Sequence, residues 1–119
     1  MSTPSPVAFR HMKRPAGSRD LADPDCLGRC GDSQGPFYVI AIKLRDGLIC
    51  DASFRTFLCP WAVAVGSALM VQLSGKTPKE ASTIEEAVIE VELGGIPRDR
   101  RYCISMALQA LRSALNQAA

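Results

Sequence analysis

The sequence predicts a small α+β domain, in which helices pack on one face of a small antiparallel β-sheet. Two observations support this fold class. Strand-forming runs occupy the first half of the folded part, and helical periodicity dominates the second half. Strands first and helices afterwards are typical of α+β folds. The length of 119 residues, with 47% hydrophobic and 22% charged residues, fits one ordinary globular domain.

The first 25 residues are rich in proline, charge and small side chains. Such a segment has too little apolar material to pack by itself. We therefore predict a flexible N-terminal arm over residues 1–25 and a folded domain over residues 26–119. The chain's one histidine, His11, lies in this arm, and we expect it to be exposed and inert.

Two strand-forming runs follow a glycine-rich stretch that we interpret as a loop. The first run covers residues 37–44 and the second covers residues 48–57. Asp46-Gly47 lies between them, and this dipeptide is typical of a tight hairpin turn. An antiparallel hairpin is therefore predicted. Cys50 shares a strand face with Ala52 and Phe54, so we expect it to have a structural role.

The second half shows helical spacing and helix boundaries. An amphipathic helix is predicted from apolar residues three and four apart, at Ala62, Val65, Leu69 and Leu73, with Ser74-Gly75 as its stop. Thr77 and Glu80 have the spacing of a capping box, as have Thr83 and Glu86, so a helix should follow each. The last predicted helix carries an apolar stripe made of Cys103, Met106, Ala107, Ala110, Leu111 and Ala114.

Charge and hydropathy exclude several classes of function. The formal net charge of +2 is far from the strongly basic composition of nucleic-acid-binding domains, so no nucleic acid is expected. No apolar run resembles a signal peptide or a membrane span, so we expect no membrane interaction and a cytoplasmic location. In that reducing compartment, the five cysteines are better suited to metal binding or thiol chemistry than to disulfides.

Cys59 and Cys103 each lie where a helix is predicted to begin. Cys59 ends the second strand and precedes Pro60, which favours a helix cap whose free N–H groups stabilise a thiolate. Cys103 follows the arginines of residues 98–101, whose positive charge also favours a thiolate. An inert, partly buried cysteine is the alternative for Cys59, and a core cysteine is the alternative for Cys103.

Cys30 and Asp32 are weaker candidates for metal ligands. Cys26 and Cys30 form a Cys-x3-Cys pair, and Asp32 follows after a glycine. The thiols of Cys30, Cys59 and Cys103 are too far apart in sequence for a local zinc finger, so only a folded domain could gather them. A Cys–His catalytic dyad has little support with a single histidine in the arm. We therefore expect a protein that is not an enzyme.

Several linked motifs give the sequence a family resemblance from about Gly35 to its C-terminus. Residues 51–59, Asp-Ala-Ser-Phe-Arg-Thr-Phe-Leu-Cys, are similar to the "D-A-x-F-x-T-x-G-C" motif of the NifU/IscU-type iron–sulfur cluster assembly scaffolds. Gly75-Lys76 with Glu80-Ala81 resembles the family's "G-K…E-A" turn. Ile96-Pro97 with Cys103 resembles its "L-P…H-C" approach to the third cysteine.

The resemblance implies a site at one end of the domain, made by three cysteines and one aspartate. It implies Cys30, Cys59 and Cys103 as ligands of a [2Fe–2S] cluster or zinc, with Asp32 as an additional metal ligand. Residues 30–32 are the only Cys-Gly-Asp in the chain, which is the family's motif for its first cysteine. The implied partners are a cysteine desulfurase, which supplies sulfur, and proteins that accept the finished cluster.

The sequence also departs from the family pattern. Tyr102 replaces the histidine before the third cysteine, and residues 98–100 replace the chaperone-binding "P-V-K", which makes the usual chaperone partner doubtful. When the family motif is aligned from the hairpin backwards without a gap, Gln34 and not Cys30 falls at the position of the family's first cysteine. We favour Cys30, because a neutral amide is a poor ligand for a soft metal site. The alternatives are a metal-free protein-interaction module and a thiol redox or sulfur-carrier protein using Cys59.

Overall fold

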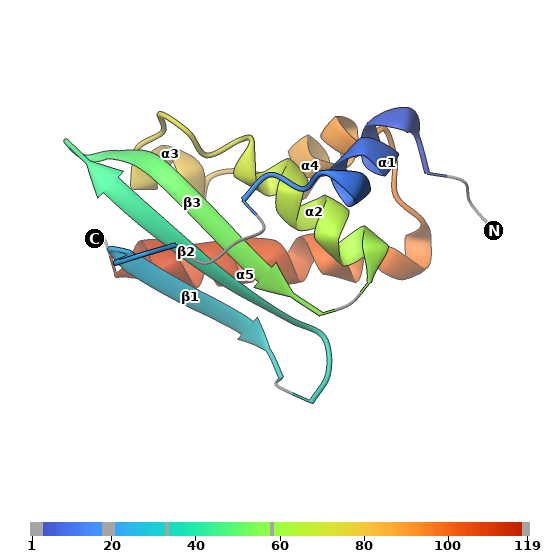
Figure 1. Cartoon of the computed structure of the whole chain (residues 1–119), viewed down its shortest axis with the longest axis horizontal. Helices are drawn as coiled ribbons and strands as arrows, with labels where there is room; N and C mark the ends of the chain where they lie inside the picture. The colour runs from blue at the N-terminus through green and yellow to red at the C-terminus, as the bar shows by residue number, and fades with distance from the viewer. Residues whose placement is uncertain (1–3, 18–20, 33, 58, 118–119) are drawn as a thin grey trace.

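The computed structural model describes residues 4–17, 21–32, 34–57 and 59–117. It contains a three-stranded antiparallel sheet in the order β1-β2-β3, formed by β1 (Cys26–Gly31), β2 (Phe37–Arg45) and β3 (Leu48–Thr56). The long helix α5 (Tyr102–Asn116) packs on β1 and β2, while α2 (Pro60–Met70) packs beside β3 (Figure 1). The predicted α+β fold is confirmed.

The hairpin between β2 and β3 turns at Asp46 and Gly47, as predicted. Their φ angles are 55° and 78°, the pair of positive values that a type I′ turn requires. Lys43 faces Asp51 and Leu44 faces Ile49, which leaves Cys50 as an extra residue in a β-bulge. Cys50 is exposed for this reason, and the prediction that it packs with the apolar face is wrong.

Strand β1 was predicted as a glycine-rich loop, and the structure corrects this. Its six residues pair with β2, from Cys26 opposite Ile42 to Gly31 opposite Phe37. Gly28 explains how such a short sequence forms a strand against α5. A Cβ atom there would lie 2.1 Å from the carbonyl oxygen of Ala110, so only glycine permits this approach of strand and helix.

The N-terminal segment also differs from expectation, because residues 6–13 form a helix, α1, that packs on the domain. The Ser5 side chain caps α1 by accepting from the Ala8 amide at 3.0 Å, and Ala8 is fully buried. After α1, the Gly17 carbonyl accepts from the Phe54 amide at 2.8 Å and covers the outer edge of β3. Part of the segment expected to be an arm therefore belongs to the folded domain. Flexibility of the remainder stays a prediction.

The helices of the second half agree with the sequence except at one cap. Helix α3 (Pro78–Ser82) begins with the predicted capping box, in which Thr77 and Glu80 exchange both hydrogen bonds. Helix α4 (Glu86–Leu93) ends at left-handed Gly94, with φ of 70°. Thr83 does not cap α4, because its hydroxyl donates to the Glu80 carbonyl at 2.7 Å and Glu85 occupies the N-cap position. A 3₁₀ turn, Arg98–Arg100, precedes α5.

Among the described residues, no helix is both long enough and apolar enough to cross a membrane.

Candidate metal centre

Cys59 lies at one end of the sheet, between the end of β3 and the start of α2. It is the N-cap residue of α2, as predicted, and Pro60 occupies the first helical position. Its carbonyl accepts from the Val63 amide at 3.0 Å, but its side chain makes no capping hydrogen bond. The thiol is half-buried. Cys59 therefore lies at the positive dipole end of α2 and is partly open to solvent.

Cys103 lies in the first turn of α5 and is fully buried. Burial, followed by the nearby negative charge of a Cys59 thiolate, raises the pKa of Cys103 to about 11. Arg100 opposes this shift, but its effect is smaller than that of burial. The expectation that neighbouring arginines favour a thiolate is therefore outweighed by desolvation. The two thiols therefore interact electrostatically.

Tyr38 lies close to both cysteines and was not singled out in the sequence. It is fully buried at the start of β2, and its hydroxyl donates to the Ala62 carbonyl at 2.6 Å. Burial raises the pKa of Tyr38, and negative charge on Cys103 or Cys59 raises it further. Tyr38 thus connects the sheet to the first turn of α2, next to Cys59. A tyrosine in an apolar strand carries no sequence signal for such a role.

Cys30 lies on the same face of the sheet but apart from the pair. It faces Tyr38 across the β1–β2 ladder, and its thiol donates to the Gln109 side-chain oxygen at 3.2 Å. Burial raises the pKa of Cys30. Gln109 follows Cys103 by six residues, which corresponds to about 9 Å along α5. In this conformation, the structure does not bring Cys30 to the other two thiols.

Asp32 and Gln34 lie in the turn between β1 and β2, and both are exposed. The Asp32 carboxylate accepts from the Gln34 amide at 3.0 Å, and the Asp32 amide donates to the Pro36 carbonyl at 3.1 Å. These bonds shape the turn. Within the part of the chain that the structure describes, no three His, Cys, Asp or Glu side chains form a group able to hold a metal ion. The ligand roles of Cys30 and Asp32 stay predictions.

Comparison with known proteins identifies the family. The family described as NifU-like N-terminal domain matches residues 5–118. The chain belongs to this family. It is 34% identical over 112 residues to the iron–sulfur cluster assembly scaffold protein IscU 1 of Archaeoglobus fulgidus, covering 93% of this chain and 73% of the relative. It is 33% identical over 110 residues to IscU of Azotobacter vinelandii, covering 88% and 85%. The resemblance inferred from the motifs is confirmed.

Solved structures show the same fold. A NifU-like N-terminal protein from Brucella abortus superposes with a TM-score of 0.72 at 17% identity, covering 95% of this chain and 92% of the other. A putative SUF-system scaffold protein from Fervidobacterium islandicum gives a TM-score of 0.71 at 17% identity, covering 93% and 95%. The family match begins at residue 5, so α1 is part of the NifU-like domain, as its packing shows.

His11 anchors α1 in this NifU-like domain, which corrects the expectation that it is exposed and inert. Its side chain is only 12% exposed, with Nδ1 2.6 Å from the Ser67 hydroxyl and Nε2 3.1 Å from the Glu92 carboxylate. Ser67 is fully buried and also accepts from the Ala16 amide at 2.8 Å. The arrangement contains the residue types of a catalytic triad, but the buried and already hydrogen-bonded Ser67 has no access to a substrate. Its role is to join α1 to α2 and α4.

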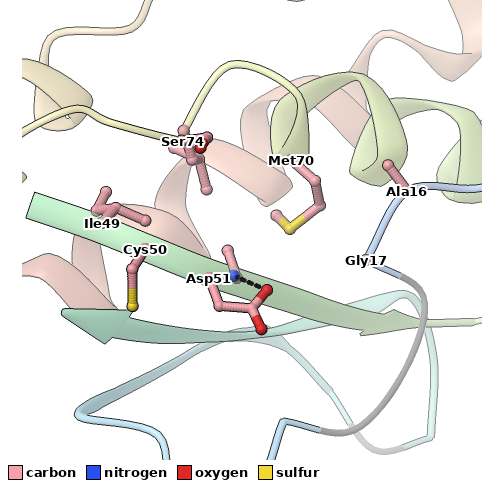
Figure 2. A pocket seen from close by; sticks show the side chains of 9 residues that line it. Ala16, Gly17, Ile49, Cys50, Asp51, Met70 and Ser74 are labelled. Carbon is pink, nitrogen blue, oxygen red and sulfur yellow. Dashed lines mark hydrogen bonds between the residues drawn. The ribbon is translucent and has the colours of Figure 1, made fainter. Parts of the chain in front are cut away.

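A separate pocket of about 200 Å³ opens at the outer edge of β3, beside Gly17 and the end of α2 (Figure 2). Cys50 and Asp51 line it, and the Asp51 carboxylate accepts from the Ala52 amide at 2.9 Å. Six residues of strand separate Cys50 from Thr56, about 20 Å at the usual rise. The pocket is therefore remote from Cys59 and is not part of the cysteine pair's site.

Proposed function

We propose that this NifU-like domain is an iron–sulfur cluster assembly scaffold in which Cys59 and Cys103 bind the cluster as cargo. The observation that carries the proposal is that these two cysteines lie at the starts of α2 and α5, at the same end of the domain, and interact electrostatically (Figure 1). The relatives named as IscU scaffold proteins support the function at the level of the family. We further propose that the chain holds its cargo rather than acting as an enzyme.

The geometry suits the binding of an anionic, sulfur-rich cargo. Cys59 precedes the first turn of α2, and Cys103 lies within the first turn of α5. Both sulfurs therefore lie beside the positive end of a helix, where an anionic cargo is favoured. Half-buried Cys59 is the sulfur that solvent and a donor protein can reach first. Fully buried Cys103 must lose its proton on binding, so cargo should be held more tightly as the pH rises.

Two thiolates are fewer than the four ligands that a [2Fe–2S] cluster or a structural zinc ion requires. We propose Cys30 as the third thiolate and Asp32 as a further ligand, as the family resemblance implies. Cys30 faces the same side of the sheet as Tyr38, which adjoins both other cysteines. To reach them, Cys30 must leave Gln109 and the end of β1 must separate from β2. A cysteine desulfurase and cluster-accepting proteins are the proposed partners.

Metal and sulfide analysis after anaerobic reconstitution with iron and sulfide tests this function. We expect the wild-type chain to retain iron and sulfide, or to retain zinc when it is purified aerobically. The variants Cys59→Ser and Cys103→Ser should lose most of the bound metal and sulfide. Cys50→Ser is the matched control, because Cys50 is exposed and remote from the pair. If Cys59→Ser and Cys50→Ser retained equal amounts of metal and sulfide, the proposed site would be refuted. Absence of metal and sulfide from the wild-type chain would refute the scaffold function.

The same assay decides which residue occupies the first ligand position. If Cys30 is the third thiolate, Cys30→Ser should lower retention about as much as Cys59→Ser, while Gln34→Ala should change it little. Equal retention by Cys30→Ser and the wild type would show that the chain supplies only two of the three cysteines. The metal-free interaction module would then be the better interpretation of the fold.

A further inference from the structure

Strand β1 is fastened most strongly at its start. The Gln117 side chain, at the end of α5, accepts from the Leu27 amide at 3.0 Å and donates to the Leu27 carbonyl at 2.7 Å. Just before the strand, the Asp25 carboxylate accepts from the Leu44 amide at 2.7 Å, and the Asp25 amide donates to the Ile42 carbonyl at 2.9 Å. The start of β1 is therefore tied both to α5 and to β2.

The same part of β1 is also buried. Cys26 is 2% exposed, and Gly28 lies so close to the Ala110 carbonyl that a Cβ atom would be 2.1 Å from its oxygen. We call residues 26–28 the base of β1. Buried contacts together with hydrogen bonds to two elements are typical of regions that resist local opening.

The next three residues, 29–31, form the tip of β1 and have less support. Arg29 and Gly31 are exposed, and Cys30 is half-buried. Leu27 directs its amide and carbonyl outward to Gln117, so the alternation of an antiparallel ladder directs those of Arg29 and Gly31 away from β2 as well. Within the tip, the ladder bonds to β2 therefore come from Cys30. Exposed segments with few hydrogen bonds are the ones that open locally.

The tip lies at the end of the sheet where β3 leads to Cys59 (Figure 1). Tyr38 pairs with Cys30 on one side and with Thr56 on the other, so Cys30 and Thr56 are two strand spacings apart, about 10 Å. Cys30 is two residues beyond Gly28, about 7 Å, so a turn of about 60° at Gly28 moves it by about 7 Å. A motion confined to the tip is therefore comparable to the width of sheet between Cys30 and the end of β3.

We propose that β1 is a hinged strand: its base stays fixed on α5, Gly28 is the pivot, and the tip moves the Cys30 thiol from Gln109 toward the cysteine pair, Cys59 and Cys103. Glycine suits a pivot because it adopts the widest range of backbone angles. The inference rests on the proposed function in assigning Cys30 as the third thiolate. It adds that the base does not open, so cargo binding leaves the bonds between Gln117 and the strand unchanged.

Alkylation of the two β1 cysteines tests the hinge, because Cys26 belongs to the base and Cys30 to the tip. Trypsin cleaves after Arg29 and places them in separate peptides, so mass spectrometry measures both rates in one chain. With iodoacetamide under native conditions, Gln117→Ala should raise the Cys26 rate about tenfold or more, as expected from the loss of two hydrogen bonds, and change the Cys30 rate by less than about twofold. Gln109→Ala should raise the Cys30 rate about fivefold and leave the Cys26 rate unchanged.

Asn116→Ala is the matched control for Gln117→Ala, because Asn116 is exposed and carries the same carboxamide one residue earlier. It should change neither rate. If Gln117→Ala raised both rates by the same factor, β1 would open as one unit and the hinge would be wrong. An unchanged Cys26 rate in Gln117→Ala would show that this side chain does not hold the base, which would equally overturn the proposal.

Oxidation with diamide at low protein concentration tests where the tip moves. When two thiols meet, diamide takes up their two protons and two electrons and becomes a hydrazine, while the sulfurs form a disulfide. We use Cys103→Ala, in which Cys59 is the remaining thiol of the pair. A disulfide between Cys30 and Cys59 should form at similar rates with and without Gln117→Ala, and Cys26 should form none with Cys59. Absence of the Cys30–Cys59 disulfide, or equal formation of a Cys26–Cys59 disulfide, would refute the hinge.

The hinge and the scaffold function fail in different experiments. If the wild-type chain retained neither metal nor sulfide but the Cys30–Cys59 disulfide formed, the hinge would stand and the scaffold function would be wrong. If the chain retained its cargo but the disulfide did not form, the scaffold function would stand and the hinge would be wrong.

Discussion

Replacing Gly28 by alanine tests how β1 is held against α5, and with it the position of Cys30 two residues further along. A Cβ atom at Gly28 would lie 2.1 Å from the Ala110 carbonyl oxygen and 2.3 Å from the Ala114 amide nitrogen. Ordinary contacts begin at 3.4 Å, so strand and helix must move apart by more than 1 Å. The obstructing atoms are backbone atoms, which no rotamer change can displace.

We expect Gly28→Ala to lower the free energy of unfolding by about 3 kcal/mol, at the upper end of typical overpacking penalties, because the backbone must move. A loss of this size corresponds to a melting temperature lower by about 10 °C or more for a domain of this length. Urea denaturation followed by circular dichroism, with the slope of the transition compared between variants, measures the change.

Gly35→Ala is the matched control for this prediction. No heavy atom lies within 4 Å of the position of its Cβ, and its φ is outside the left-handed range. Alanine there should leave stability unchanged or raise it by up to about 1 kcal/mol, because it restricts the unfolded chain. If Gly28→Ala costs less than about 1 kcal/mol, β1 is not pressed against α5. The contact between Cys30 and Gln109 would then lose its structural basis.

Three further predictions concern buried groups around the site. Tyr38→Phe should lower the free energy of unfolding by about 1–2 kcal/mol in urea, because the Ala62 carbonyl loses a donor, and unchanged stability would contradict that bond. His11→Ala should cost about 1–2 kcal/mol in thermal unfolding, and no loss would show that α1 is not anchored through Ser67 and Glu92. The pKa of Cys103 is raised from 9.0 to about 11, so the stability that its neutral thiol contributes is complete below pH 9 and is lost as the pH rises through 11. The stability advantage of the wild type over Cys103→Ala should therefore shrink between pH 9 and pH 11, and a constant difference would refute the shift.

The sequence predicted the elements whose signals are local. The type I′ turn needs only Asp46-Gly47, the start of α3 needs only Thr77 and Glu80, and α5 follows from one apolar stripe. Each signal lies within a few residues of the structure it specifies. Elements with local signals could therefore be placed without knowledge of the rest of the fold.

The two elements that the sequence missed depend on distant residues. Strand β1 forms where Gly28 meets the backbone of α5, more than 80 residues later in the chain. Helix α1 is fixed by the contact of Ser5 with Leu93 and by that of His11 with Ser67 and Glu92. The composition of residues 1–25 predicts a segment that cannot pack by itself. It gives no information about the surface of α2 and α4, on which α1 packs. Tertiary contacts supplied what the local sequence lacked.

The residues of the candidate site also differ in how well the sequence predicted their positions. Cys59 and Cys103 were placed correctly at helix starts, because Pro60 and the apolar stripe of α5 mark those positions. Cys30 was expected in a flexible loop, but it lies in β1 and pairs with Tyr38 of β2. Reaching the other thiols means separating Cys30 and Gly31 from Tyr38 and Phe37, which involves a few hydrogen bonds of about 1 kcal/mol each.

The free energy of metal coordination by a thiolate is large enough to drive the separation of these residues from β2. Structural zinc sites built on thiolates and imidazoles contribute about 10–16 kcal/mol in small peptides. If one more thiolate contributed even a third of that free energy to cargo binding, the gain would exceed the cost of unpairing the last two residues of an edge strand. The strand therefore does not exclude Cys30 from the site. If Cys30 is the third thiolate, as proposed, it must exchange its hydrogen bond to Gln109 for the cargo, so the end of β1 should differ between the free chain and the loaded chain.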